Sequence, residues 1–287
     1  MTQEIKLTST GSLLAKCWQT AEEQLRSSIG SKHRGANEEQ ITFLLQGELR
    51  TALDEANSRG LFGQSFVADL IRGVPDLRRY TTDLRFARRL IGTVHFHSRH
   101  HEGTVSASDL VLVIRKPITA YSQSPERKLV VSEGGVRALF AQAKLGRPAA
   151  NGSIHWGQLT ENQIERFPAM LDFMTLFLYR WRDSSGTELE PLTWQPCRAH
   201  TIVEVEEWLS QDAFPTEMTS EAVIRGLTVG SFGTDNRRLV DEFAEEHGAK
   251  RWSVLEIRLA WPPGDVPPNG VSISFPRETL PSIVSLR

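Results

Sequence analysis

The sequence predicts a mixed α/β or α+β fold in which helices flank a central mixed sheet. Three observations predict it. Apolar residues recur every three or four positions from Leu13 to Ile29, which is typical of an amphipathic helix. Apolar and polar side chains alternate from Ile91 to Ser98, and short apolar runs that begin at Asp109 and Val136 have the length of buried strands. A capping-box pattern at Thr160 then begins another helix.

Length and composition limit the class of protein. With 287 residues the chain can form one core domain and a smaller addition. We expect a core in residues 1–183 and a smaller C-terminal α+β extension in residues 184–287, because a turn-forming Ser184-Ser185-Gly186 segment lies between them. The N-terminus has no apolar signal segment, no apolar run could span a membrane, and the two cysteines match no zinc-binding pattern. These features predict a cytoplasmic protein without a membrane segment.

Two helices open the predicted core. The first covers Leu13–Ile29, and the second begins after Asn37, a favourable N-cap, and continues to about Asn57. Glu38 shares a helix face with Ile41 and Leu45, so its carboxylate is expected to lean over the sheet. The alternative is that Glu38 only stabilises the positive end of the helix dipole.

Strands fill the middle of the chain. After the second helix we expect a short helix at Asp83–Leu90 and two hairpins separated by a polar loop, Pro117–Arg127. The strands of these hairpins are 91–98 paired with 109–115, and 128–132 paired with 136–145. His95 and His97 share one face of the first strand, as a metal-binding pair could, although histidines in such strands are more often surface residues.

The C-terminal half reads as a helix followed by mixed elements. The helix that Thr160 caps is expected to continue to Trp181, with a kink at Pro168. Beyond it the patterns predict an extended segment, a helix and two strands, at Pro191–Val205, Asn236–His247, Trp252–Trp261 and Val271–Phe275.

The candidate chemistry lies at strand ends. Asp109 stands at the mouth of one apolar strand, and Gln142 and Lys144 lie on one face of another. Burying an amide and an ammonium is unfavourable unless each has a polar partner, and a metal-bound phosphate would supply both. Hard cations prefer oxygen, so Asp109 is the best metal ligand, with the Gln142 carbonyl beside it and Glu38 acting through water or at a second metal. Lys144 would orient the attacking water or stabilise developing charge.

The opposing interpretation gives these residues no chemistry. Asp109 would cap a turn, and Lys144 would reach solvent at a strand end. Other catalytic classes lack their motifs, because the chain contains no GxxxxGK[ST] phosphate-binding loop and no GxSxG nucleophile elbow.

The ordered set resembles the PD-(D/E)XK nuclease superfamily, in which a helical Glu and a strand-mouth Asp precede a (D/E)-x-Lys strand. Glu38, Asp109 and Gln142-Ala143-Lys144 match it across about residues 36–180, and Gln142 in the second acidic position resembles the QxK variant of the Mrr-like restriction branch. The resemblance implies a restriction-endonuclease-like core that uses Mg²⁺ or Mn²⁺ to hydrolyse phosphodiester bonds, chiefly in DNA, in restriction or anti-phage defence. It also implies that Gln163, on the next helix, faces the site.

Partners follow from the charge pattern. The net charge of −2 gives no general attraction to nucleic acid, but seven arginines and two aspartates lie between Arg72 and His101. The residues expected to bind nucleic acid are Arg78, Arg79, Arg88, Arg89, Arg99 and Gln163. Ordinary solvated faces are the alternative. A homodimer is expected, since cutting two strands takes two centres.

A second class of function stays open. The chain could be a catalytically inactive nucleic-acid-binding or protein-interaction subunit of a multi-gene defence system. Residues 199–224 hold six acids and no lysine or arginine, and this acidic stretch could dock a partner protein.

Overall fold

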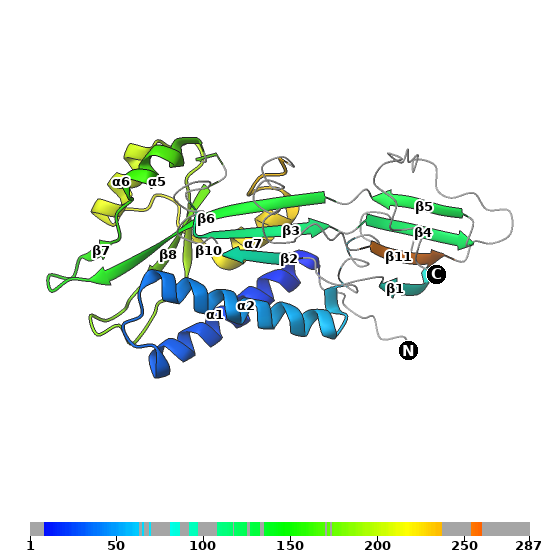
Figure 1. The fold of residues 1–287 in the computed structure, drawn as a ribbon, viewed down its shortest axis with the longest axis horizontal. Helices are drawn as coiled ribbons and strands as arrows, with labels where there is room; N and C mark the ends of the chain where they lie inside the picture. Colours follow the sequence, from blue (N-terminus) through cyan, green and yellow to red (C-terminus); the bar gives the residue numbers. More distant parts are fainter. Residues whose placement is uncertain are drawn as a thin grey trace.

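A mixed sheet with helices on both faces forms the centre of the molecule (Figure 1), which confirms the predicted mixed α/β class. The computed structural model describes residues 9–62, 65, 69, 81–86, 92–96, 108–116, 118–124, 127–132, 135–169, 171–172, 174–236 and 254–259. The strands of the main sheet are β2 (Gly92–Phe96), β3 (Leu110–Lys116), β6 (Gly135–Pro148), β7 (Ile154–Trp156), β8 (Met174–Arg180), β9 (Thr193–Pro196) and β10 (Met218–Thr219). Within the described residues their order is β10-β9-β8-β6-β3-β2, and β7 pairs with the far end of β6.

Two long helices precede the sheet, as predicted. Helix α1 (Thr10–Lys32) begins where the Ser9 hydroxyl accepts the Ser12 N–H. Helix α2 (Glu38–Ser58) begins at Asn37, whose side chain accepts the Gln40 N–H at 2.8 Å while Gln40 accepts the Asn37 N–H at 3.0 Å. This reciprocal capping fixes the first turn of α2, which carries Glu38.

The two faces of the sheet bury separate apolar clusters. Helices α1, α2 and α7 (Ser220–Val229) cover one face, and α5 (Glu161–Arg166) and α6 (Ile202–Gln211) cover the other. Neighbouring residues of β6 alternate between them, so that Leu139 belongs to the first cluster and Phe140 to the second. Burial on both faces explains why β6 and β8 are apolar along most of their length.

Strand pairing agrees with the first predicted hairpin and corrects the second. β2 and β3 are antiparallel, as expected, with His95 opposite Val111. β6, however, pairs with β3 and, in parallel, with β8, whereas the strand at 128–132 joins another sheet. The connection between β6 and β8 runs through α5.

A smaller four-stranded sheet lies beyond the C-terminal end of β3 and the N-terminal end of β6 (Figure 1), and its strand order is β1-β11-β4-β5. Its strands are β1 (Thr81–Phe86), β4 (Ile118–Ser124), β5 (Arg127–Ser132) and β11 (Val254–Leu259). The loop predicted at Pro117–Arg127 is therefore wrong over β4, and the helix predicted at Asp83–Leu90 is wrong over its first residues. β4 contains the β-favouring residues Ile118, Thr119 and Tyr121, and the short connection to β5 favours local pairing over the predicted pairing of 128–132 with β6.

The helix predicted from Thr160 to Trp181 is also wrong beyond its first turns. α5 ends at Arg166, a 3-10 turn covers Phe167–Ala169, and Met174–Arg180 is strand β8. Pro168 has no N–H to continue the helix, so the kink expected there is an end. β8 is buried on both faces, and such a strand lacks the polar alternation that separates a strand from a buried helix.

The C-terminal third contributes to the same sheet. β9 pairs with β8 and β10 with β9, while the expected extended segment Pro191–Val205 gives way to α6 at Ile202. β11 lies within the predicted strand Trp252–Trp261; the helix Asn236–His247, apart from its first residue, and the strand Val271–Phe275 lie outside the described residues. The division of the chain at residue 183 stays a prediction.

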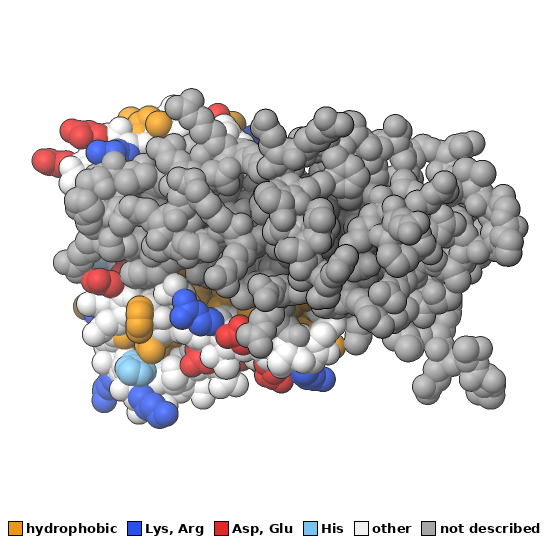
Figure 2. All heavy atoms as spheres, turned by 45° about the vertical axis from the view of Figure 1, so that its right-hand side comes forward, with side chains coloured by type: hydrophobic (Ala, Val, Ile, Leu, Met, Phe, Trp, Pro, Cys, Tyr) orange, Lys and Arg blue, Asp and Glu red, His pale blue; other side chains and the backbone are white. Residues whose placement is uncertain are grey.

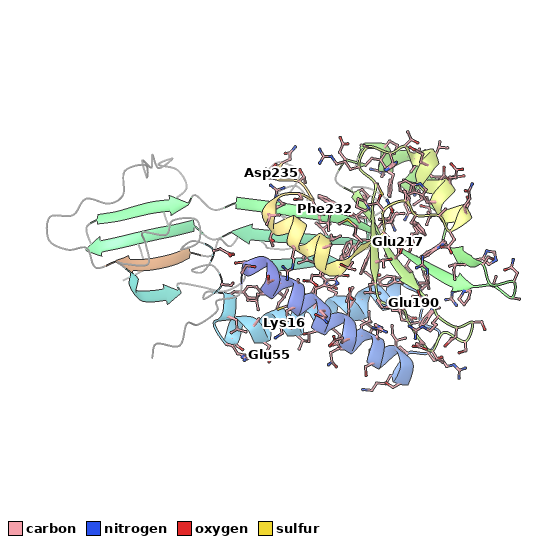
Figure 3. The ribbon with its side chains drawn as sticks, turned by 180° about the vertical axis from the view of Figure 1, so that it is seen from behind. Lys16, Glu55, Glu190, Glu217, Phe232 and Asp235 are labelled. Atoms are coloured by element: carbon pink, nitrogen blue, oxygen red, sulfur yellow. The ribbon has the colours of Figure 1, made fainter. Side chains whose placement is uncertain are left out.

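After α7 the chain returns to β6, near Phe232 and Asp235 in Figure 3. Ala138 and Thr234 exchange two backbone hydrogen bonds of 2.8 Å. Arg137 reaches the Asp235 carboxylate at 3.4 Å. On the face drawn in Figure 2, cationic and anionic side chains are interspersed over the described surface.

Candidate functional site

The candidate site is a gap in the hydrogen bonding along one edge of β6. Pairing with β3 ends at Ala141, and pairing with β7 begins at Gly146. Between these points the backbone N–H groups of Ala143 and Leu145 pair with no described strand. We call this edge, residues 142–145, the β6 notch. Its N–H groups need other acceptors, because unpaired buried backbone groups are costly.

Asp109 occupies one end of the notch. Its N–H donates to Ala141 O at 3.0 Å, and its Oδ2 accepts the Ala143 N–H at 2.8 Å and the Gln142 Nε2–H. The carboxylate therefore continues the β3–β6 pairing one step beyond the last backbone pair. The strand-mouth position expected for Asp109 places it in direct contact with Gln142.

Glu38 occupies the other end. Its Oε2 accepts the Leu145 N–H at 2.7 Å, so the first residue of α2 reaches back to the sheet. Neighbouring N–H groups on one strand edge are about 7 Å apart. The two carboxylates therefore bind the edge of β6 at separate points, one at Ala143 and the other at Leu145.

A buried hydrogen-bond chain holds Glu38 in place. The Tyr179 hydroxyl donates to Thr42 Oγ1 at 2.9 Å, and the Thr42 hydroxyl donates to the Glu38 carbonyl at 2.8 Å. Burial raises the pKa of the Tyr179 phenol well above its usual value, and the charges of Asp109, Glu38 and Glu22 add to the increase. Tyr179 is thus close enough to both carboxylates of the notch to be affected by their charge.

Gln142 lies beside Asp109 and is fully buried. Its Nε2 donates to Asp109 and, at 3.3 Å, to Ala143 O. Turning the amide over would point its oxygen at the Asp109 carboxylate, so this orientation is fixed by charge. Gln142 Oε1 then has no hydrogen-bond partner among the described residues, at an expense of about 1–3 kcal/mol that a cation could offset.

Lys144 is buried, with 3% of its surface exposed. Its Nζ donates to Gln158 O at 3.1 Å and to Gln163 Oε1 at 3.3 Å. The alternative that Lys144 reaches solvent is therefore wrong. Gln163 Oε1 also accepts the Thr160 N–H at 3.0 Å, so the capping box that starts α5 also orients the lysine.

The loop after β7 closes the notch. Gly157 N–H donates to Leu145 O at 3.2 Å. A Cβ added to Gly157 would lie 3.5 Å from Glu38 Oε2 and 4.0 Å from Lys144 Cδ. Glu38 and Lys144 therefore come within contact of a single backbone position, although they lie 106 positions apart in the sequence.

The structure brings together five predicted site residues: Glu38, Asp109, Gln142, Lys144 and Gln163. Gln163 was expected to bind nucleic acid, and its buried side chain contacts Lys144. The predicted nucleic-acid-binding arginines lie outside the described residues, namely Arg78, Arg79, Arg88, Arg89 and Arg99. The His95–His97 pair is not tested, because His97 also lies outside them.

Several contributors were not predicted. Tyr179 was placed in a helix, Thr42 had no assigned role, and the Gln158 carbonyl has no signature in a sequence. Only Thr42 offered a signal, since it lies one helical turn after Glu38.

The site suits a hard cation better than a soft one. Its possible ligands are two carboxylates and the Gln142 carbonyl oxygen, all of which are oxygen donors. In the described part of the chain, no group of three or more His, Cys, Asp or Glu residues is placed to hold a metal. A cation at the notch would thus depend on the neutral Gln142 oxygen.

No protein-family model matches this chain, and no curated protein matches its sequence. Among the described helices, none combines the length and apolar character needed to cross a bilayer.

Proposed function

We propose that this chain is a metal-dependent nuclease with a restriction-endonuclease-like core, which hydrolyses phosphodiester bonds in DNA and acts in restriction or anti-phage defence. The observation that carries the proposal is the meeting of four side chains at the β6 notch: Glu38, Asp109, Gln142 and Lys144. They come from a helix, a strand mouth and a neighbouring strand, in the order that the PD-(D/E)XK pattern requires.

Asp109 and Gln142 Oε1 would hold Mg²⁺ or Mn²⁺, with Glu38 acting through water or at a second ion. The Gln142 oxygen is buried and has no partner within the described part of the chain, which supports this assignment. When bound, the cation would lower the pKa of a water and reduce the charge on the phosphate.

Lys144 would provide a fixed positive charge beside the scissile phosphate. Its Nζ donates to two neutral oxygens, from Gln158 and Gln163, which fix the position of the ammonium group. A preorganised cation in a buried site stabilises charge that develops on the phosphate oxygens without reorganisation. Gln163 is then a positioning residue for Lys144.

A non-catalytic role is the second candidate, and one observation favours it. Asp109 and Glu38 already accept backbone N–H groups of β6, which is a sufficient structural reason for both carboxylates. The chain would then bind nucleic acid or a partner protein within a defence system.

Cleavage of DNA distinguishes the nuclease from the non-catalytic role. Purified protein should cut plasmid DNA with Mg²⁺ or Mn²⁺, and Asp109→Ala and Lys144→Ala should each lower the rate by about 100-fold or more. Asp54→Ala and Lys16→Ala are matched controls, because both side chains are exposed on α2 and α1; Lys16 is labelled in Figure 3. Thermal unfolding should show that all four variants are folded.

Two results would change the assignment. Full activity in both site variants would remove the notch from the mechanism. DNA binding by a wild-type protein that cleaves neither DNA nor RNA with either metal would favour the non-catalytic role. Cutting of both strands in one encounter, with a dimer in solution, would support the expected homodimer.

A further inference from the structure

The β6–β7 hairpin, residues 146–156, projects beyond the notch at the left of Figure 1. Arg147 and His155 lie opposite each other on its two strands, and both are exposed. By the alternation of β6, Arg147 lies on the same side as Leu145, the side from which α2 approaches. Arg147 is two residues, or about 7 Å, beyond the backbone group that Glu38 binds.

The hairpin is firmly anchored. Trp156 packs over Gly146, where an added Cβ would lie 3.0 Å from the indole ring. The Trp156 Nε1–H donates to Asp212 at 2.7 Å, and the Arg180 guanidinium lies 5.1 Å from the ring centroid. The Phe214 ring meets Trp156 edge to face at 5.1 Å.

Arg180 itself is fixed by carboxylates from three segments. It forms ion pairs with Glu190 at 3.8 Å, Asp212 at 3.5 Å and Glu217 at 3.0 Å; Glu190 and Glu217 are labelled in Figure 3. Its charge is therefore used within the fold. The fold thus holds a short hairpin rigidly through Trp156, while the two strands present Arg147 and His155 outward.

The charge of Arg147 is available to a ligand. The segment 145–160 contains no acid, and no described carboxylate forms an ion pair with Arg147. Arginine presents N–H donors in a planar fork that matches a phosphate group. A rigid support lowers the entropy lost when such a side chain binds.

We propose that the β6–β7 hairpin binds the DNA backbone beside the notch, with Arg147 contacting a phosphate and His155 a neighbouring backbone oxygen. The inference rests on the proposed nuclease function, because it identifies the substrate as a polymer that continues past the site. Such contacts fix the position of the duplex and carry no sequence information.

The test is the salt dependence of DNA binding in the absence of cleavage. Affinity of the full chain for a 20-base-pair duplex is measured in EDTA between about 50 and 200 mM salt, where each phosphate contact contributes about 0.9 to the slope of log K against log salt. Arg147→Ala should reduce the slope by about 1 and weaken binding equally for unrelated sequences. Arg147→Lys should restore the slope, because it restores the charge, and His155→Ala should weaken binding further when added to Arg147→Ala.

Arg198→Ala is the matched control. Arg198 is also exposed, and it follows the end of β9 that lies beside Met174, at the opposite end of β8 from Arg180. Helix α6 begins at Ile202, and its first half, which follows Arg198 closely in the chain, carries Glu204, Glu206 and Glu207, which repel phosphate. This variant should keep the wild-type affinity and slope.

Wild-type affinity and slope in the Arg147→Ala, His155→Ala double variant would overturn the hairpin assignment, whether or not the protein cleaves DNA. A reduced slope in a protein that never cleaves DNA would support the hairpin and refute the nuclease. Absence of DNA binding by the wild type at all salt concentrations would also overturn the hairpin assignment.

Discussion

Glu22 offers a quantitative test of how α1 is attached to the rest of the fold. Its carboxylate accepts the Trp18 Nε1–H at 2.6 Å and the Ser220 hydroxyl, and Ser220 accepts the Trp194 Nε1–H at 2.9 Å. This network joins α1 to α7 and β9. Burial raises the pKa of Glu22 from 4.5 to about 7, and the charge of Glu23 adds to the effect; the bonds from Ser220 and Trp18 and the charge of Arg26 oppose it.

The direction of the pH effect follows from the pKa of Glu22 in the folded protein and in the unfolded chain. The folded protein holds the Glu22 proton more tightly than the unfolded chain, so stability falls as the pH rises from about 4.5 to about 7. Above that range ionised Glu22 costs the folded state about 3 kcal/mol, at 1.36 kcal/mol for each tenfold change in proton affinity. Glu22→Gln keeps an acceptor for Trp18 and Ser220 and has no charge to bury.

The measurement is urea unfolding of wild type and Glu22→Gln between pH 4.5 and 8. We expect similar stability at pH 4.5 and a gain of up to about 3 kcal/mol for the variant at pH 8. Asp54→Asn is the control, because the Asp54 side chain is exposed on α2 and should show no such gain. A variant no more stable than wild type at pH 8 would refute the buried-carboxylate reasoning.

Two further predictions concern the site and its hairpin. Gln142→Glu should destabilise the metal-free protein by about 1–3 kcal/mol, because a second buried carboxylate would replace the amide that donates to Asp109. Mn²⁺ should raise the melting temperature of this variant more than that of wild type. An equal rise in both proteins would contradict metal binding beside residue 142. Gly146→Ala should lower the free energy of unfolding by about 1–3 kcal/mol, because its Cβ would lie 2.7 Å from Ile154 Cγ2. Gly47→Ala, with open space in α2, should raise it by about 0.5–1 kcal/mol in the same urea titrations. Equal effects of the two substitutions would contradict the tight packing at Gly146.

Local patterns predicted part of the fold. The amphipathic run at Leu13–Ile29 and the cap at Asn37 depend on neighbours within one or two turns, and both helices form where expected. The β2–β3 hairpin also follows from local alternation. Such features are visible in a sequence because their interactions are short in range.

The predictions of secondary structure and strand pairing were wrong where contacts between distant segments decide the structure. Met174–Arg180 is apolar on both faces, so its sequence does not distinguish a strand from a buried helix, and the parallel pairing with β6 decides in favour of a strand. The pairing of β4 with β5 competed with a pairing of β5 with β6 that local signals permitted equally. The small sheet also needs β11, more than 100 residues further along the chain.

The site shows the same division. Asp109, Gln142 and Lys144 could be chosen from their positions on apolar strands, and the contact between Asp109 and Gln142 follows from the strand register. The sequence could not reveal that β3 begins too late to pair with Ala143 and Leu145, so that carboxylates take over as acceptors. Nor could it reveal the Gln158 carbonyl beside Lys144, because any residue can supply a backbone oxygen.

We propose that the β6 notch binds a divalent cation through Asp109 and Gln142, and anomalous diffraction from a crystal soaked in Mn²⁺ would locate that ion. We expect a peak within about 2.2 Å of an Asp109 carboxylate oxygen and of Gln142 Oε1, and loss of that peak in Asp109→Ala. No peak at the notch in a crystal with saturating Mn²⁺, or a peak that persists unchanged in Asp109→Ala, would refute metal binding at the notch.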